Sequence, residues 1–305
     1  MAFTAADVKN LREMTGVGMM DCKKALTEAN GDMDKAVELL REKGLAASQK
    51  KAGRIAAEGM AYAAVIDGVG VVVEVNAETD FVAKNDKFVD FVKGVAATVA
   101  ANKPADLDAL MACKYVGTDM TVLEQQQEMV LVIGENIKVR RFAFYTEGVC
   151  VPYIHAGGKI GVLVNLETDL TAEQVNEAGK DAAMQIAALN PRFWDKSQVT
   201  QDVLDEEKKI MLVQMENDPK MASKPEKVKE NIVMGKLNKF YSENCLLQQE
   251  FVKDNTMTVE KYLAAAAKAL GGTITFKDAV RFEKGEGIEK KQENFAEEIA
   301  KQLAK

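Results

Sequence analysis

A seven-residue sequence occurs twice in this chain, first as Val75-Asn76-Ala77-Glu78-Thr79-Asp80-Phe81 and again as Val164-Asn165-Leu166-Glu167-Thr168-Asp169-Leu170. Each copy follows a run of apolar residues typical of a β-strand and leads into a helical pattern. The spacing between the copies is too long for a solenoid repeat and indicates a duplicated α+β subdomain. The first copy ends in an aromatic residue, Phe81, where the second has Leu170. We therefore expect the first copy to carry the working surface.

Composition limits the kinds of protein this chain can be. Its 305 residues suggest about two domains. It has no apolar run long enough to span a membrane and no signal-peptide pattern at its start. The net charge of −7 argues against a general nucleic-acid binder. The four cysteines are far apart and form no CxxC motif, so we expect free thiols in a reducing, cytoplasmic compartment.

The chain has one histidine, His155, which argues against catalytic triads and histidine zinc sites. It contains neither a phosphate-binding GxxxxGK[ST] loop nor a GxGxxG motif after a strand. Residues 157–159 are Gly-Gly-Lys between two β-like runs, so a hairpin turn is expected there. We therefore expect no catalytic residue, metal site or cofactor. An enzyme site built only from carboxylates and lysines remains the alternative.

Residues 1–54 have the pattern of three short helices. Thr4 is expected to cap the first helix, with Asp7 completing a capping box. Residues 15–18 interrupt the pattern, and a second helix is expected over residues 20–29. The third is expected to begin after Asp32 and to end at Gly44 as a C′ residue.

Residues 55–170 have the pattern of two hairpins with a helix between them. Strands over 60–66 and 69–75 flank Asp67-Gly68, a dipeptide typical of primed hairpin turns. A helix capped by Thr79 or Asp80 is expected to continue past Val95, and a strand over 139–145 to complete the first sheet. The strands expected in the second copy are 149–154 and 160–166.

The C-terminal half is rich in helical patterns. Helices over 198–216 and 226–251, separated by proline-containing turns, indicate an antiparallel helical hairpin. A helix over 258–270, a short strand over 273–276 and an amphipathic helix over 286–305 are expected to follow.

Taken together, these segments resemble the bacterial elongation factor Ts family. The resemblance covers nearly the whole chain and rests on long, specific matches over residues 8–26, 78–85, 155–164 and 231–251. It implies an α+β fold with a ubiquitin-associated-like three-helix domain over 1–54, without implying that the chain binds ubiquitin. Two related core subdomains, over 55–145 and 146–275, would follow. The second would include a protruding helical hairpin at about 190–250, and a C-terminal module would cover 276–305.

The resemblance also implies a function, namely guanine-nucleotide exchange on elongation factor Tu without covalent chemistry. Asp80 and Phe81, flanked by Thr79 and Val82, would enter the partner's nucleotide domain near its magnesium ion. Further contacts would come from the following residues: Arg12, Met19, Met20, Gly134, His155 and Gly157. Some family members form a homodimer through the helical hairpin, and in others the C-terminal helix docks on the partner. No direct contact with nucleic acid or membrane is expected.

Each of these residues also has a structural alternative. Phe81 could be buried in its own subdomain, as phenylalanine usually is. Met19 and Met20 could pack in the core of the three-helix unit, although adjacent loop residues rarely both point inward. His155 and Gly157 could simply form an exposed turn. The apolar residues of the helical hairpin (Met211, Leu212, Met215 and Trp194) could pack within one chain or between two. A protein that holds a GTPase without exchanging its nucleotide is the main functional alternative.

Overall fold

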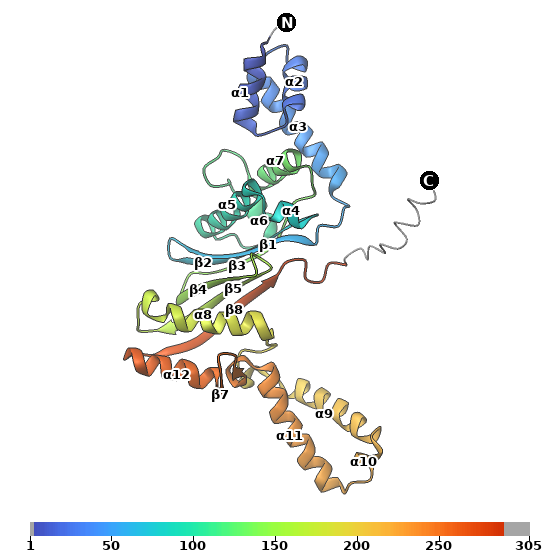
Figure 1. The fold of residues 1–305 in the computed structure, drawn as a ribbon, viewed down its shortest axis with the longest axis vertical. Helices are drawn as coiled ribbons and strands as arrows, with labels where there is room; N and C mark the ends of the chain where they lie inside the picture. The colour runs from blue at the N-terminus through green and yellow to red at the C-terminus, as the bar shows by residue number, and fades with distance from the viewer. Residues whose placement is uncertain (1–2, 290–305) are drawn as a thin grey trace. The chain divides into compact units, whose positions relative to one another are not determined.

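A computed structural model describes residues 3–289 as an α+β fold that divides into two compact units (Figure 1). The first unit contains the described residues up to Phe144, together with 154–161 and those from Phe282 onward. The second contains Tyr145–Tyr153 and Val162–Arg281. The sheets have three, three and two strands. The α+β class is therefore confirmed, whereas the expected helix over 286–305 lies mostly outside the described residues.

Three helices form the N-terminal part of the first unit: α1 (Ala5–Thr15), α2 (Met19–Glu28) and α3 (Met33–Lys51). Thr4 and Asp7 form the predicted capping box, and Gly16 ends α1 in the left-handed conformation, with φ of 68°. Leu11 and Leu26 are fully buried in the core that the three helices share. Local capping residues and apolar spacing therefore predicted the three helices correctly.

The predicted end of the third helix at Gly44 was wrong, because α3 continues to Lys51. Gly44 is buried where α3 crosses α7 (Val122–Ile133). A Cβ atom on Gly44 would lie 3.3 Å from the backbone oxygen of Gln127. The glycine therefore serves the close approach of two helices, a tertiary contact that its sequence neighbours do not reveal.

The first sheet has the order β1-β2-β3, formed by β1 (Glu58–Ile66), β2 (Val69–Ala77) and β3 (Lys138–Tyr145). Strands β1 and β2 pair antiparallel through the predicted turn, in which Asp67 and Gly68 have φ of 49° and 80°. Every residue of β2 is buried. The main core lies between this strand and the apolar face of α5 (Asp86–Asn102), where Phe88 is fully buried.

The single helix predicted after the first repeat is in fact two helices. A short helix, α4 (Asp80–Ala83), is capped by Thr79, and Asn85 caps α5 separately. The side chain of Asn85 accepts a hydrogen bond from the backbone nitrogen of Lys87. Asparagine favours N-caps over helix interiors, so it restarts the helix at this point. The helix α6 (Leu107–Ala112) then leads toward α7.

The second sheet has the order β4-β5-β8 and consists of β4 (Val149–His155), β5 (Ile160–Thr168) and β8 (Ile274–Glu283). The prediction placed β8 over only 273–276, whereas the strand continues to Glu283. In the second unit, α8 (Ala172–Leu189) packs on this sheet closely enough that a Cβ on Gly179 would lie 2.4 Å from Val151. The later helix α12 (Val259–Leu270) matches its prediction.

The helical hairpin consists of α9 (Gln201–Glu216), the short α10 (Pro219–Ala222) and α11 (Glu226–Asn244). A short 3-10 helix, η1 (Lys196–Gln198), precedes it. In Figure 1 the hairpin extends away from α8 and α12 within the second unit. Met211 and Met215 are buried in the hairpin's own core, so they pack within one chain, while Leu212 is exposed. Trp194 lies outside this core and donates a hydrogen bond to Asp278, 2.7 Å away.

The prediction that the second hairpin helix reaches residue 251 was wrong. The chain leaves the helix at Cys245, which has an extended backbone conformation, and forms η2 (Leu246–Gln248). The two-stranded sheet of β6 (Glu250–Phe251) and β7 (Asp254–Thr258) follows. Phe251 stacks on Tyr262 of α12, with ring centroids 4.2 Å apart. At the helix end itself, Phe193 donates a hydrogen bond of 3.0 Å to the backbone oxygen of Asn244 and accepts one of 2.9 Å from Leu246, so contacts with a distant segment accompany the early end of the helix.

None of the helices in the part of the chain that the structure describes is long and apolar enough to cross a membrane. The four cysteines are free thiols, as expected; Cys22 and Cys245 are buried, and Cys113 and Cys150 are partly exposed. Burial raises the pKa of the Cys245 thiol to about 11. That thiol is therefore protonated and packed rather than reactive at neutral pH.

Candidate partner-binding site

Phe81 lies at an exposed tip of the first unit, on the short helix α4. Its side chain is 80% exposed, whereas the next two residues, Val82 and Ala83, are buried against the core. The core alternative for Phe81 is therefore excluded in this structure, and Val82 takes the inward position instead. A phenylalanine so exposed leaves a large apolar surface in water and is a candidate contact residue.

The backbone of this tip is held by Glu135, in the turn that follows α7. The Glu135 carboxylate accepts hydrogen bonds from the backbone nitrogens of Glu78 and Thr79, at 3.1 and 3.0 Å. It also accepts one from the Thr79 hydroxyl at 2.7 Å. The same hydroxyl oxygen caps α4 by accepting a hydrogen bond from the backbone nitrogen of Val82. Thr79 therefore connects the start of α4 to the turn after α7.

Glu78 also accepts a hydrogen bond from the turn that follows α7. Its carboxylate accepts a hydrogen bond of 2.6 Å from the backbone nitrogen of Asn136 and forms an ion pair of 3.4 Å with Arg54. The amide of Asn136 donates to the backbone oxygen of Arg54. Glu135 and Asn136 directly follow Gly134, which ends α7 with φ of 88°. The structure thus places the predicted residue Thr79 in a hydrogen-bonded network with the two residues that directly follow the predicted residue Gly134.

Sequence reasoning missed Glu135. It lies far from the repeat along the chain, and an acidic residue after a helix-ending glycine is typical of an ordinary exposed turn. The sequence did show that Glu135 follows a candidate contact residue, Gly134. That position alone does not predict which backbone N–H groups donate hydrogen bonds to its carboxylate.

The two copies of the repeat use their acidic residue differently. In the first copy Asp80 is exposed and pairs with Lys84 at 3.2 Å, one helical turn away. In the second copy, Asp169 accepts hydrogen bonds from the backbone nitrogen and the hydroxyl of Thr273, at 2.6 and 2.9 Å. These bonds lower the pKa of the Asp169 carboxyl. The acid of the second copy is thus tied to its own unit, and that of the first is displayed at the surface.

The first turn of α2, directly after the loop that follows α1, presents two further candidates, Met19 and Met20. They are 43% and 62% exposed, and Arg12 on α1 is also exposed. The core alternative is therefore excluded for both methionines. Lys87, in the first turn of α5, donates a hydrogen bond of 3.3 Å to the backbone oxygen of Gly16 in this loop. The loop is in this way attached to the helix that follows the Phe81 tip.

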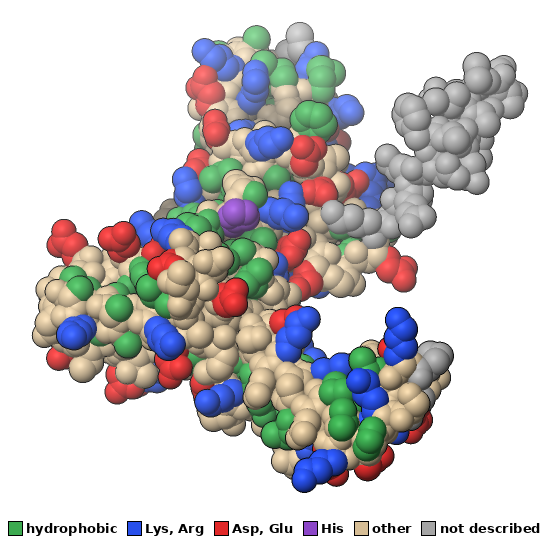
Figure 2. Space-filling model, turned by 60° about the horizontal axis from the view of Figure 1, so that its bottom comes forward, with side chains coloured by type: hydrophobic (Ala, Val, Ile, Leu, Met, Phe, Trp, Pro, Cys, Tyr) green, Lys and Arg blue, Asp and Glu red, His purple; other side chains and the backbone are tan. Residues whose placement is uncertain are grey.

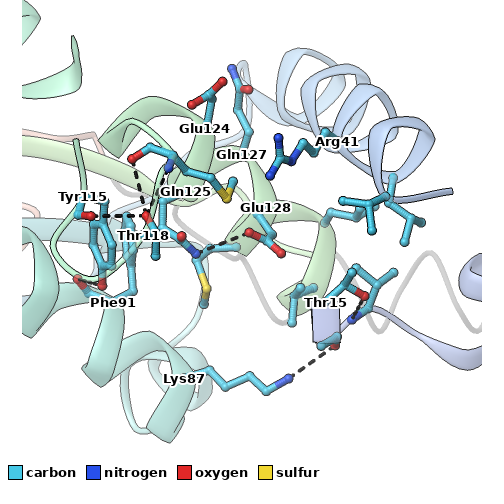
Figure 3. A pocket seen from close by; sticks show the side chains of 18 of the residues that line it. Thr15, Arg41, Lys87, Phe91, Tyr115, Thr118, Glu124, Gln125, Gln127 and Glu128 are labelled. Carbon is cyan, nitrogen blue, oxygen red and sulfur yellow. Dashed lines mark hydrogen bonds between the residues drawn. The ribbon is translucent and has the colours of Figure 1, made fainter. Parts of the chain in front are cut away.

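A groove of about 750 Å³ lies beside this attachment, between α1 and α3 on one side and α5 and α7 on the other (Figure 3). Figure 3 shows Lys87 reaching along its edge toward the end of α1 at Thr15. Glu128 projects into the groove from α7, and burial raises the pKa of its carboxyl although Arg41 and Lys87 act to lower it. Apolar side chains line most of the remaining wall, including those of Leu40 and Met129.

His155 is the last residue of β4 and Gly157 lies in the turn between β4 and β5, and both are exposed. His155 appears in purple at the surface in Figure 2. The turn needs left-handed backbone at Ala156, Gly157 and Gly158, whose φ values are 47°, 64° and 96°. The backbone oxygen of Gly158 accepts a hydrogen bond of 2.8 Å from Ala61 of β1. This turn thus belongs to the first unit and is joined there to β1.

Comparison with known proteins gives a consistent result. The family model of elongation factor TS matches residues 78–286, which is most of the chain. An elongation factor Ts from Clostridium kluyveri is 49% identical over 98% of this chain and 98% of its own length. One from Syntrophotalea carbinolica is 48% identical over 98% and 99% of the two chains, and one from Clostridium perfringens is 50% identical over 98% of each. With its duplicated repeat and its exposed Phe81 tip, the chain belongs to the elongation factor Ts family.

Proposed function

We propose that this protein releases GDP from elongation factor Tu so that GTP can bind, during translation elongation in the cytoplasm. Membership of the elongation factor Ts family implies this exchange role. The observation that supports it best is Phe81, a well-exposed aromatic side chain on a backbone tied down by three hydrogen bonds to a neighbouring turn. A rigid, exposed aromatic residue suits insertion into an apolar pocket of a partner.

The proposed mechanism acts on the partner's metal and phosphate site. GDP is held in GTPases mainly by electrostatic contacts of its phosphates with magnesium and by backbone donors of the phosphate loop. Phe81 enters the nucleotide domain beside this site, with Asp80 next to it, and displaces the elements that hold the metal. No bond is made or broken in this protein, and the magnesium belongs to the partner.

The energy required exceeds what one side chain supplies. A thousandfold faster release corresponds to about 4 kcal/mol off the barrier. A buried aromatic anchor contributes about 2–4 kcal/mol at an interface. Other contacts must therefore share the work, and we propose two groups of them. Arg12, Met19, Met20 and Gly134 contact the same nucleotide domain, whereas the turn with His155 and Gly157 contacts a second domain of the partner.

Exchange in this scheme follows from linkage. The protein binds nucleotide-free elongation factor Tu best, so it weakens GDP and GTP binding alike. The excess of GTP over GDP then sets the direction of exchange. Binding is mediated by protein surfaces, and we propose no direct contact with nucleic acid, in keeping with the net charge of −7.

The test is the release of fluorescent GDP from purified elongation factor Tu, followed by stopped flow. The wild-type protein should accelerate release in proportion to its concentration. Phe81→Ala should lower the acceleration by about 30- to 1000-fold, the equivalent of about 2–4 kcal/mol. The matched control is Val116→Ala, which truncates another exposed apolar side chain of the same unit and should leave the rate unchanged. Binding without any acceleration would instead identify a protein that holds the GTPase.

A homodimer through the helical hairpin is a second part of the proposal. The hairpin leaves several apolar side chains exposed, and Ile210, Val213 and Met234 are the most exposed of them. Exposed apolar surface of this kind suits a contact with another chain. Sedimentation velocity on the wild type and on Val213→Glu tests it. A mass that stays monomeric at micromolar concentration in the wild type would rule the dimer out.

A further inference from the structure

Glu135 has an arrangement of partners that an ordinary surface glutamate lacks. One of its carboxylate oxygens accepts hydrogen bonds from two successive backbone nitrogens, those of Glu78 and Thr79, and the other accepts the Thr79 hydroxyl. All three donors precede Phe81 by no more than three residues. Hydrogen bonds from backbone N–H groups to a charged acceptor are among the stronger ones in proteins. Glu135 therefore fixes the backbone from which α4, and with it Phe81, begins.

The second copy of the repeat shows what this arrangement replaces. There the segment is held by its own acid, because Asp169 accepts hydrogen bonds from Thr273, and Thr168 donates one of 2.6 Å to the backbone oxygen of Thr273. Leu170 packs so closely on Gly272 that a Cβ there would lie 2.6 Å from it. Asp169 therefore uses one carboxylate oxygen within its own unit, although its side chain remains exposed. In the first copy Glu135 supplies the anchoring carboxylate, which leaves Asp80 and Phe81 at the surface.

We propose that Glu135 is a positioning residue for nucleotide exchange, which holds the Asp80–Phe81 tip in its binding conformation before the partner arrives. The proposal rests on the proposed function and adds to it a residue that need not touch the partner. A tip that is ordered in advance avoids the entropy cost of ordering it on binding. Glu135 also joins the tip to the turn at Gly134, so the two contact surfaces form one rigid element.

Two substitutions of Glu135 distinguish the geometry of the three hydrogen bonds from the charge of the carboxylate. Glu135→Ala removes every acceptor and leaves the two backbone nitrogens without their partner. Glu135→Gln keeps one oxygen for these nitrogens, and its amide nitrogen can donate to the Thr79 hydroxyl oxygen. The glutamine therefore restores the geometry without the charge. A role through position predicts rescue by glutamine, whereas a direct charge contact with the partner predicts that glutamine fails like alanine.

The first measurement needs no partner. Amide hydrogen exchange on the full-length free protein should be faster at Glu78 and Thr79 in Glu135→Ala, and close to wild type in Glu135→Gln. The second measurement is GDP release from elongation factor Tu. Glu135→Ala should lower the exchange rate about 10- to 100-fold, the effect expected from a misplaced contact group. Glu135→Gln should remain within about threefold of wild type.

A double-mutant cycle decides whether Glu135 acts through Phe81. In a Phe81→Ala background, Glu135→Ala should add less than about a twofold loss, whereas in a Met20→Ala background its full effect should remain. Full additivity with Phe81→Ala would overturn the proposal, as would unchanged amide exchange at Glu78 and Thr79 in Glu135→Ala. If the wild type itself fails to release GDP, the proposed function fails, while the amide-exchange result still decides whether Glu135 orders the tip.

Discussion

Lys87 and Gly16, which lie far apart in sequence, are joined by a hydrogen bond of 3.3 Å from the lysine Nζ to the glycine backbone oxygen. Gly16 ends α1, so its carbonyl lies at the negative end of the helix dipole, where a cation is favoured. Lys87 begins α5, shortly after the Phe81 tip. The bond therefore connects the loop that precedes Met19 and Met20 to the helix that follows the tip.

Lys87→Ala should loosen the loop at Gly16 and, with it, the position of Met19 and Met20 at the start of α2. A typical hydrogen bond contributes about 0.5–1.5 kcal/mol net, and we take this range for the exposed Lys87 bond, so the concentration for half-maximal GDP release should rise about 2- to 13-fold. The maximal rate should fall much less than in Phe81→Ala, because Phe81 is untouched. Stopped-flow titration separates the two quantities. Lys87→Arg should retain most of the effect, and Lys93→Ala, also exposed on α5, is the matched control. An unaltered half-maximal concentration in Lys87→Ala would show that the bond does not position the loop.

The accuracy of the sequence predictions followed the range of the interactions involved. The cap at Thr4 and the turn at Asp67 and Gly68 depend on neighbouring residues, whereas the exposure of Phe81 was expected only from the family resemblance. The end of α3 and the end of α11 depend on contacts with distant segments, and the predictions of both ends were wrong. The anchoring of the tip by Glu135 is of the second kind. Which site residues lie together was therefore decided by tertiary hydrogen bonds that spacing along the chain does not encode.

Two glycines of the β1–β2 hairpin allow backbone strain and steric overlap to be separated. Gly68 has φ of 80° and open space where a Cβ would stand, whereas Gly59 has φ of 118° and its Cβ would lie 2.2 Å from the backbone oxygen of Val75. Gly68→Ala should cost about 1–2 kcal/mol. Gly59→Ala should cost roughly 3 kcal/mol or more, because backbone must move. The single tryptophan, Trp194, lies in the second unit, so its fluorescence does not report on this hairpin. The measurement is therefore amide hydrogen exchange of the buried β2 residues. Equal losses for both variants would contradict the steric argument.

Glu74 is a fully buried carboxylate on β2 whose charge is balanced by two arginines. Arg140 and Arg141 approach it at 2.9 and 2.5 Å, and the backbone nitrogen of Gly285 donates to it at 2.8 Å. Glu74→Ala should destabilise the first unit by about 3 kcal/mol, because Arg140 and the backbone nitrogen of Gly285 lose their buried acceptor, whereas Arg141 keeps its pair with Glu286.

The measurement is urea denaturation followed by far-ultraviolet circular dichroism. Amide exchange at Gly285 should also accelerate, because its acceptor is lost. Glu13→Ala removes an exposed pair with Lys9, 3.6 Å apart, and should change stability by no more than about 0.5 kcal/mol. A comparable effect of the two variants would mean that burial does not strengthen the Glu74 cluster.

Two glutamates on α7 should respond to pH with opposite signs. Burial raises the pKa of Glu128, against the influence of Arg41 on α3 and Lys87 on α5. Hydrogen bonds from the backbone and hydroxyl of Thr121 lower the pKa of Glu124, which completes the N-terminal capping box of the helix. The unfolded chain has a glutamate pKa of about 4.3 in both cases. The folded state therefore favours the protonated form of Glu128 and the ionised form of Glu124.

Stability from Glu128 is fully present below about pH 4.3 and is lost as the pH rises through its folded pKa. Glu128→Gln should therefore be more stable than wild type at pH 7, and the difference should shrink toward pH 4. Stability from Glu124 is present above about pH 4.3 and is lost as the pH falls through its folded pKa. Glu124→Gln should thus be less stable at pH 7 and converge with wild type in acid. Urea denaturation of both variants at several pH values checks the signs. A loss of stability at pH 7 in Glu128→Gln would mean that Arg41 and Lys87 outweigh burial, and that the groove holds a stabilising ion cluster.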